Sequence, residues 1–309
     1  MRALWNEYNK VFTFINVYMI QEDKEFKISV VIPTYNRLTY LSRAITSVLK
    51  QSYPVNEIIV VDNGSTDQTL SFIKKNFTRI RVITEKKRGV SFARNLGIKN
   101  CKYNWIAFLD SDDEWKTDKI EKQFVLLKES NFKYQFIHTN EIWIKNGILK
   151  NQKKKHLKRG GHIFEDCLDI CKISPSSVLI KKELFDKYGL FDYRFKVCED
   201  YELWLRITSK IKIGYLDKPL IKKYGGHKGQ LSEKYWGIDR YRIKALEKIL
   251  INNNLKKQQK LKVLEYLLKK INIILLGAIN RNNKRIFNMY IKKKFLWMNY
   301  NYYVKNKNN

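Results

Sequence analysis

The chain has 309 residues, a formal net charge of +31 and 44% hydrophobic residues. That length suits one large domain with an appended region, and that apolar content excludes a mainly disordered chain. The excess of Lys and Arg suits a phosphate-rich partner such as a nucleic acid or an anionic membrane, but lysine-rich solvated surface explains it equally well.

No run reaches the roughly 18 to 20 apolar residues that a membrane span requires. The apolar run 11–20 is short and lacks the small-residue cleavage site of a secretory signal. We therefore expect a cytoplasmic protein in which residues 1–26 form an N-terminal extension. Its four cysteines are expected to be reduced. Cys167 and Cys171 lie near His162, but their spacing favours buried thiols over a zinc site.

Residues 27–109 alternate short β-rich runs with amphipathic stretches, which predicts a mostly parallel sheet covered by helices. The predicted strands are 28–33, 57–61, 80–84 and 105–109. The predicted helices are 38–51, 66–76 and 90–100, the second capped by Ser65 or Thr66. Residues 117–146 predict a helix and then two strands. The basic segment 150–161 ends in two glycines and is a candidate mobile lid.

Polar loops follow three of the predicted strands. In open sheets of this kind, ligands bind at the carboxyl ends of the strands, where the loops diverge. We therefore expect the three loops to share one pocket. They are Thr34-Tyr35-Asn36-Arg37, Asp62-Asn63-Gly64-Ser65 and Asp110-Ser111-Asp112-Asp113.

The third loop concentrates negative charge. Neighbouring carboxylates repel one another, so such a cluster normally persists because a cation is bound or a proton is shared. Oxygen ligands suit Mg²⁺ or Mn²⁺ bridging a diphosphate. A solvated acidic turn, or a helix start for Asp113, is the alternative interpretation.

Two further features suit a nucleotide ligand. An aspartate at a strand end, such as Asp62, can accept from a base imide or a ribose hydroxyl, and the helix that follows favours an anion. Arg94 lies in an otherwise apolar predicted helix and needs an anionic partner. That partner is either a diphosphate or a structural ion pair with Asp110.

Together, residues 30–37, the Asp62 loop, residues 89–97 and the acidic loop occur in the order and spacing typical of family 2 glycosyltransferases. The resemblance is close over about residues 27–140 and looser to about residue 235. It implies a GT-A fold, an α/β architecture with a Rossmann-like, mostly parallel central sheet. It also implies a nucleotide-diphosphate sugar donor, usually of UDP, and transfer with inversion at the anomeric carbon.

The resemblance also implies roles for individual residues. Asp62 would contact the base, and Asp112 would be the direct ligand of Mn²⁺ or Mg²⁺. Asp110 would hold ribose or metal-bound water, and His227 would complete the metal shell or touch the diphosphate. The donor-binding residues would be Pro33, Thr34, Tyr35, Asn36, Asp62, Asn63, Gly64, Arg94, Asp110 and Ser111.

Residues 198–206 resemble the family's Glu-Asp-x-x-Leu-Trp segment, which supplies the catalytic base. An inverting displacement needs a carboxylate to take the proton of the acceptor hydroxyl. We favour Asp200 as this base, with Glu199 second. The alternative is that both acids only favour a helix N-terminus electrostatically.

We therefore expect a catalytic domain at 27–235, with a nucleotide-sugar-binding half at 27–115 and an acceptor and base half at 116–235. A basic helical region follows at 236–309. Residues 241–309 hold seventeen Lys and Arg but two acids, which suits contact with the anionic inner face of a membrane; a helical cap packed on the catalytic domain is the alternative.

The expected acceptor is a glycan or a lipid-linked molecule of cell-surface polysaccharide or lipooligosaccharide synthesis. A sugar-nucleotide nucleotidyltransferase is the rival enzyme, but its first loop would contain glycine, and residues 34–37 contain none. A basic module for nucleic acid or membranes is the second rival. No nucleic-acid-binding motif is visible, so no nucleic acid is expected.

Overall fold

The computed structural model describes residues 26–227, 235–252 and 254–307. Most of the predicted N-terminal extension, and residues 228–232 of the glycine-rich turn after His227, therefore lie outside the described residues.

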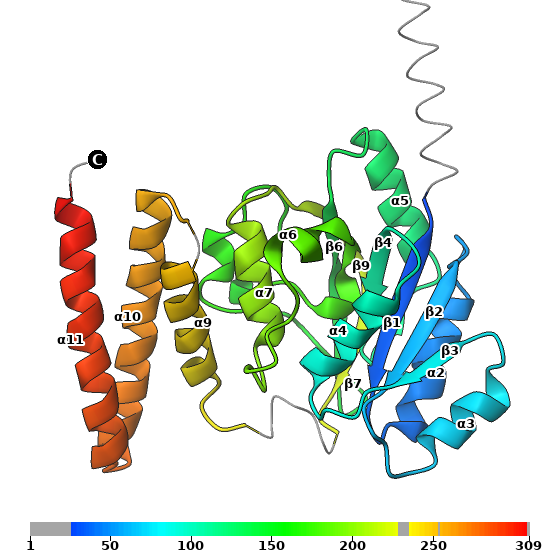
Figure 1. Cartoon of the computed structure of the whole chain (residues 1–309), viewed down its shortest axis with the longest axis horizontal. Helices are drawn as coiled ribbons and strands as arrows, with labels where there is room; N and C mark the ends of the chain where they lie inside the picture. Colours follow the sequence, from blue (N-terminus) through cyan, green and yellow to red (C-terminus); the bar gives the residue numbers. More distant parts are fainter. Residues whose placement is uncertain (1–25, 228–234, 253, 308–309) are drawn as a thin grey trace, which may run out of the picture.

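The centre of the molecule is one mixed sheet in the order β3-β2-β1-β4-β8-β6-β9-β5, with β7 paired to β6 (Figure 1). Strands β3, β2, β1 and β4 are parallel, and β8 runs antiparallel between β4 and β6. The predicted α/β class is confirmed. The strands are β1 Ile28–Thr34, β2 Glu57–Asp62, β3 Arg81–Thr84, β4 Trp105–Phe108, β5 Glu114–Trp115, β6 Phe136–Lys145, β7 Ile148–Lys150, β8 Leu179–Lys181 and β9 Gly214–Gly225.

The helices flank this sheet and extend beyond it. They are α2 Leu38–Leu49, α3 Thr69–Asn76, α4 Val90–Asn100, α5 Lys119–Glu129, α6 Glu183–Tyr188, α7 Glu199–Thr208, α9 Ile238–Asn252, α10 Lys257–Asn280 and α11 Lys284–Asn306. Short 3-10 turns lie at η1 Lys154–His156, η2 Glu165–Cys167 and η3 Pro175–Ser177.

The predicted cap of α3 is wrong. The helix begins at Thr69, after Gln68, so neither Ser65 nor Thr66 precedes it directly. The polar groups of both residues serve the neighbouring loop instead. The Ser65 hydroxyl accepts from the Asn36 amide at 3.0 Å, and the Thr66 amide donates to Asn36 Oδ1 at 2.8 Å. Contacts between two strand ends therefore override the local capping signal.

The central strands β1 and β4 bury both of their faces, because helices cover the sheet on each side. Val31 belongs to one hydrophobic cluster with Ala93 of α4, whereas Val30 belongs to another with Ile45 of α2. This alternation follows from the two-residue period of a strand.

Gly97 allows α4 to approach β1 closely. A Cβ at this position would lie 2.3 Å from Cγ1 of Val31, which is buried and cannot move aside. We therefore expect Gly97→Ala to lower the free energy of unfolding by about 1 to 3 kcal/mol, because overpacking outweighs the helix propensity of alanine. Urea unfolding measures this.

Gly277 of α10 provides the matched control. The three atoms nearest to a Cβ there all belong to the guanidinium end of Arg281, a flexible side chain. Gly277→Ala should leave stability unchanged or raise it slightly. Equal effects of the two substitutions would contradict the close approach of α4 to β1.

The C-terminal helices extend the molecule to one side. In Figure 1, α7, α9, α10 and α11 follow one another outward from the sheet. Leu264 and Ile271 of α10 belong to the same hydrophobic cluster as Trp204 of α7, and buried Lys270 lies 3.3 Å from both Asp169 and Asp239. One face of the region therefore packs on the rest of the protein. Within the described ranges, no helix combines the length and the apolar character needed to cross a bilayer.

The cysteines are free thiols. Cys167 is buried, and burial raises its pKa to about 12. This thiol is therefore neutral at neutral pH. Cys167 is a buried thiol as the spacing predicts, and Cys171 is half-buried.

Candidate active site

The loops after β1 and β2 lie together at the carboxyl edge of the sheet. Thr34 is paired with Asp62 in the strand register. Asn36 has a left-handed backbone, with φ of 50°, and joins the two loops through its bonds to Ser65 and Thr66. Two of the three loops that were expected to share a pocket, those after β1 and β2, therefore lie in contact.

The loop that begins at Asp62 is held by its own side chains. Both carboxylate oxygens of Asp62 accept from the Ser65 amide at 3.2 Å, which closes a tight turn around Gly64. Gly64 has φ of +74°, a conformation that side chains disfavour. Asn63 accepts from the amide of Gly89 at 2.7 Å and so attaches the start of α4 to this loop.

Arg88 completes this part of the site, although no residue pattern had indicated it. Its guanidinium lies 3.4 Å from the centre of the half-exposed Tyr35 ring. It also donates to the carbonyl of Asn63 at 2.7 Å and to that of Gly64 at 2.8 Å. A fixed cation and an aromatic ring therefore stand side by side beside the Asp62 turn.

Within the acidic loop, Asp113 does not start a helix, and that interpretation is wrong. Helix α5 begins six residues later, at Lys119, and Asp113 is buried. Its carboxylate accepts from the Ser176 hydroxyl at 2.7 Å, and the Asp110 amide donates to the same hydroxyl oxygen at 3.1 Å. Burial raises the pKa of Asp113 well above its usual range, although Lys223 opposes the shift. Asp113 therefore fixes the shape of the loop from beneath, and Ser111 is buried beside it.

Asp112 and His227 face each other at the rim of the sheet. Asp112 Oδ2 lies 3.0 Å from His227 Nε2, and Arg43 donates to the Asp112 carbonyl at 2.6 Å. Burial disfavours the ionised form of Asp112, but the hydrogen bond to His227 and the charge of Arg37 outweigh it, so its pKa is lowered. The carboxylate is therefore ionised at neutral pH.

A carboxylate oxygen and an imidazole nitrogen at this separation can both ligate one divalent cation, so these two residues fit the expected metal. The full expected set of Asp110, Asp112 and His227 is not gathered into one cluster. In the part of the chain that the structure describes, no three His, Cys, Asp or Glu side chains are grouped to hold a metal ion. Asp110 faces Arg94 instead.

Arg94 bridges two distant parts of the chain. Its Nη2 lies 2.7 Å from Asp110 Oδ1, and its Nη1 lies 2.6 Å from Glu199 Oε1. The side chain is only 4% exposed. Burial disfavours its charge, but Asp110 and Glu199 outweigh this effect and raise its pKa. The expected ion pair of Arg94 with Asp110 is observed, and the bridge joins the acidic loop to the start of α7.

Removing this bridge should be costly for stability. Arg94→Met leaves Glu199 buried without its cation, so we expect the free energy of unfolding to fall by about 3 to 5 kcal/mol. Adding Glu199→Gln to Arg94→Met should recover part of that loss, because it removes the unpaired charge. Denaturant titration of both single variants and the double variant measures the coupling. Strict additivity of the two effects would contradict the bridge.

The two candidate bases have different surroundings. Glu199 is 6% exposed and is held by Arg94, and burial raises its pKa to about 7 although Arg94 opposes the shift. Asp200 is half-buried. Its Oδ1 accepts from the Tyr201 amide at 2.7 Å, and its Oδ2 lies 3.5 Å from Cys171 Sγ. The Asp200 carboxylate is therefore the more accessible of the two.

A half-buried lysine lies close to the charges of the acidic loop and Asp200. Lys223 of β9 donates to the Ser174 hydroxyl at 3.1 Å. Burial disfavours its ammonium form, but the charges of Glu141 and Asp113 outweigh it and raise its pKa. No sequence motif marks Lys223 or Ser176, because each meets its partners only through the folded sheet.

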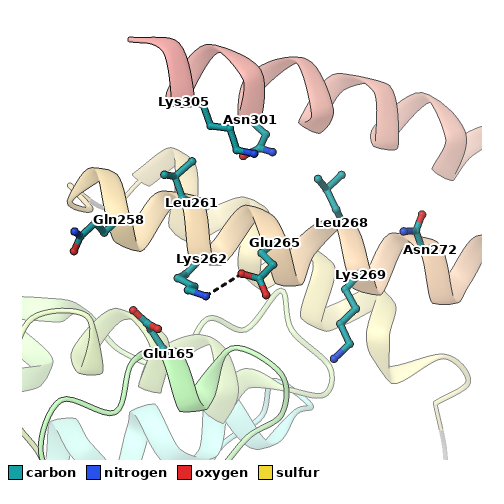
Figure 2. A pocket seen from close by; sticks show the side chains of 10 residues that line it. All are labelled: Glu165, Gln258, Leu261, Lys262, Glu265, Leu268, Lys269, Asn272, Asn301 and Lys305. Carbon is teal, nitrogen blue, oxygen red and sulfur yellow. Dashed lines mark hydrogen bonds and ion pairs between the residues drawn. The ribbon is translucent and has the colours of Figure 1, made fainter. Parts of the chain in front are cut away.

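A groove of about 740 Å³ lies elsewhere, between α10, α11 and the turn η2 (Figure 2). Lys262 and Glu265 form an ion pair at 3.0 Å along it. None of the candidate site residues lines this groove. The hollow shape of this groove therefore does not mark the candidate active site at the strand ends.

Comparisons with known proteins show which family and fold this chain resembles. The family model described as "Glycosyl transferase family 2" matches residues 29–189. An uncharacterized glycosyltransferase of Rickettsia felis is 39% identical over 223 residues, covering 70% of this chain and 36% of that protein. The UDP-Glc:alpha-D-GlcNAc-diphosphoundecaprenol beta-1,3-glucosyltransferase WfgD of Escherichia coli is 32% identical, covering 62% of this chain and 74% of WfgD.

Among solved structures, S. aureus TarS 1-349 in complex with UDP-GlcNAc superposes with a TM-score of 0.72 at 19% identity, covering 88% of this chain and 81% of that one. This likeness concerns the fold. The match spans about a third of the length of the Rickettsia felis relative and of similar Rickettsia proteins.

Proposed function

This chain belongs to glycosyl transferase family 2, and from that premise we propose that it transfers a sugar from a nucleotide-diphosphate donor to an acceptor hydroxyl with inversion at the anomeric carbon. The donor is a UDP-sugar, and the acceptor is a glycan or a lipid-linked molecule of cell-surface polysaccharide or lipooligosaccharide synthesis. The names of WfgD, which includes UDP-Glc and diphosphoundecaprenol, and of TarS with UDP-GlcNAc support this choice.

The Arg94 bridge is the observation that carries the proposal. One guanidinium binds Asp110 of the acidic loop and Glu199 at the start of α7. The acidic loop and Asp200, the residue after Glu199, therefore border the same site. An inverting transfer needs this pairing, because the leaving diphosphate and the attacking hydroxyl lie on opposite sides of the anomeric carbon.

On the donor side, Asp62, Asn63 and Gly64 with Pro33 to Asn36 contact the nucleoside. Tyr35 and Arg88 offer a ring and a cation beside them. Asp112 and His227 would hold Mn²⁺ or Mg²⁺, and Asp110, which is paired with Arg94, would hold ribose or metal-bound water. A bound ion would supply positive charge that stabilises the leaving diphosphate.

On the acceptor side, Asp200 accepts the proton of the acceptor hydroxyl. The oxygen of that hydroxyl forms a bond to the anomeric carbon, and the bond from the anomeric carbon to the diphosphate oxygen breaks. Glu199 stays bound to Arg94 and keeps the start of α7 in place. Orientation of the two substrates and stabilisation of the leaving group supply most of the rate.

A thermal-shift screen of nucleotides tests the donor class. UDP with Mn²⁺ should stabilise the protein by about 2.7 kcal/mol at a hundred times its Kd, and GDP or CMP should do less. Stabilisation by no uridine nucleotide would refute the proposed donor. Release of pyrophosphate from nucleoside triphosphate and sugar phosphate would instead favour the nucleotidyltransferase.

We further propose that the region 241–309 contacts the anionic inner face of the cytoplasmic membrane. Its helices expose Leu276, Ile279, Phe295 and Leu296 among many lysines. Deleting the region would uncover the core that α10 covers, so point variants make the better test. Phe295→Ser with Leu296→Ser should weaken flotation with anionic liposomes, and unchanged flotation would count against this contact.

A further inference from the structure

A second basic surface borders the candidate base, and we call residues 145–157 the acceptor-side surface. It comprises the end of β6, the strand β7 and the loop through η1. Residues 142–164 contain no Asp or Glu. Five lysines of the surface are exposed, and within the described ranges none of them has a carboxylate oxygen within 4.0 Å: Lys145, Lys150, Lys153, Lys154 and Lys155.

Aliphatic side chains are exposed among these lysines. Ile148 is 60% exposed, Leu149 is 65% exposed and Leu157 is 68% exposed. The turn Asn146–Gly147, with φ of 51° and 77°, presents the first two at the tip of a hairpin. Exposed leucine and isoleucine within a cationic surface form the pattern of proteins that lie on anionic bilayers.

The surface is anchored from beneath, although its sequence had indicated a mobile lid. The Lys158 ammonium is buried, lies 3.3 Å from Glu141 Oε1 and donates to the Lys172 carbonyl at 2.7 Å. The His156 ring lies 4.8 Å from that of Trp143. The Lys172 side chain donates in turn to the Leu157 carbonyl at 3.1 Å. These contacts hold the exposed lysines in a defined position.

The acceptor-side surface lies near the candidate base on one side and near a candidate metal ligand on the other. Cys171, the neighbour of Lys172, lies 3.5 Å from Asp200. At the tip, the Asn146 amide donates to the carbonyl of Gly225 at 3.1 Å, two residues before His227. The acceptor-side surface therefore lies beside both Asp200 and the pair formed by Asp112 and His227.

We propose that the acceptor-side surface lies on the phosphate layer of an anionic membrane, with Ile148, Leu149 and Leu157 inserted between headgroups, so that Asp200 faces acceptors held in that membrane. This inference rests on the proposed function, because it takes the acceptor to be lipid-linked. The sugar of such an acceptor lies one diphosphate away from the bilayer, so the base must work close to the headgroups. Exposed aliphatic rather than aromatic side chains favour a bilayer over the stacked bases of a nucleic acid.

Charge reversal tests the proposal in the full-length protein. The variant carries Lys153→Glu, Lys154→Glu and Lys155→Glu. The matched control carries Lys50→Glu, Lys74→Glu and Lys75→Glu, which change the net charge equally at exposed positions of α2 and α3 or just beyond them. Flotation with vesicles of phosphatidylcholine and phosphatidylglycerol measures binding, and thermal unfolding checks that both variants fold.

We expect the binding constant of the first variant to fall by about 100-fold, the loss expected for three surface lysines, and that of the control by less than about threefold. Equal losses in both variants would mean that net charge alone acts and would overturn the proposal. Unchanged flotation of the first variant would overturn it too, as would a loss confined to binding of single-stranded oligonucleotides.

A variant pair Leu149→Ser and Leu157→Ser should weaken flotation at high salt, where lysines are screened.

Hydrolysis of UDP-sugar by the first variant, measured without vesicles, separates this inference from the proposed function. Wild-type rates with weakened flotation are the expected result. If the wild-type protein uses no UDP-sugar but the two charge-reversed variants still differ in flotation, the proposed function fails and the acceptor-side surface stands.

Discussion

Replacing Asp200 with Asn is expected to lower the rate of sugar transfer by about a thousandfold while leaving the affinity for UDP within about twofold. General bases contribute factors of about 10² to 10⁴, and an amide cannot take the acceptor proton. Asp200 touches none of the residues that we assign to the nucleoside, so the donor should bind as before. The two side chains have nearly the same shape, and the hydrogen bond from the Tyr201 amide can persist to the amide oxygen.

Steady-state transfer at saturating donor measures kcat, and calorimetric titration with UDP measures donor binding. Asp186→Asn on α6 is the control, because that carboxylate is exposed. Glu199→Gln is the informative comparison. Its main effect should be on stability, through the lost ion pair with Arg94. If Asp200→Asn keeps wild-type turnover and Glu199→Gln abolishes it, the assignment of the base is reversed.

Much of the donor side could be predicted from the sequence, because strands and their following loops are local patterns. Helix α4 has the predicted bounds, 90–100, and β1 extends the predicted strand by one residue. Once the strands are known, the parallel order places the Asp62 loop and the acidic loop at one edge. The roles of those residues come from the family resemblance and stay predictions.

The contacts beneath the site could not be predicted, because they join residues far apart in the chain. Asp113 binds Ser176 across 63 positions, and Arg94 meets Glu199 across 105. A run of acids shows charge density but not which carboxylate is buried. The capping error at α3 has the same origin, since Ser65 is drawn to Asn36 across 29 positions.

The metal assignment predicts a second large effect. Asp112→Asn should lower kcat/KM by about 10² to 10³ and remove most of the stimulation by Mn²⁺, because a neutral amide is a weaker ligand and would hold less of the cation that offsets the charge of the diphosphate. His227→Ala should have a smaller effect, since it removes a neutral donor and leaves the carboxylate. Titrating Mn²⁺ into the protein with UDP, followed by electron paramagnetic resonance of the free ion, measures binding without turnover.

Asp186→Asn again serves as the control and should keep the wild-type affinity for Mn²⁺. The Arg43 side chain donates to the backbone carbonyl of Asp112, and Asp112→Asn keeps this contact. The substitution should therefore not unfold the loop. Because the pKa of Asp112 is lowered, protons do not compete with the cation for this carboxylate near neutral pH. Any loss of Mn²⁺ affinity on mild acidification must then come from another group. If Asp112→Asn binds Mn²⁺ as the wild type does, the metal lies elsewhere. The role of Asp112 would then be limited to its contact with His227.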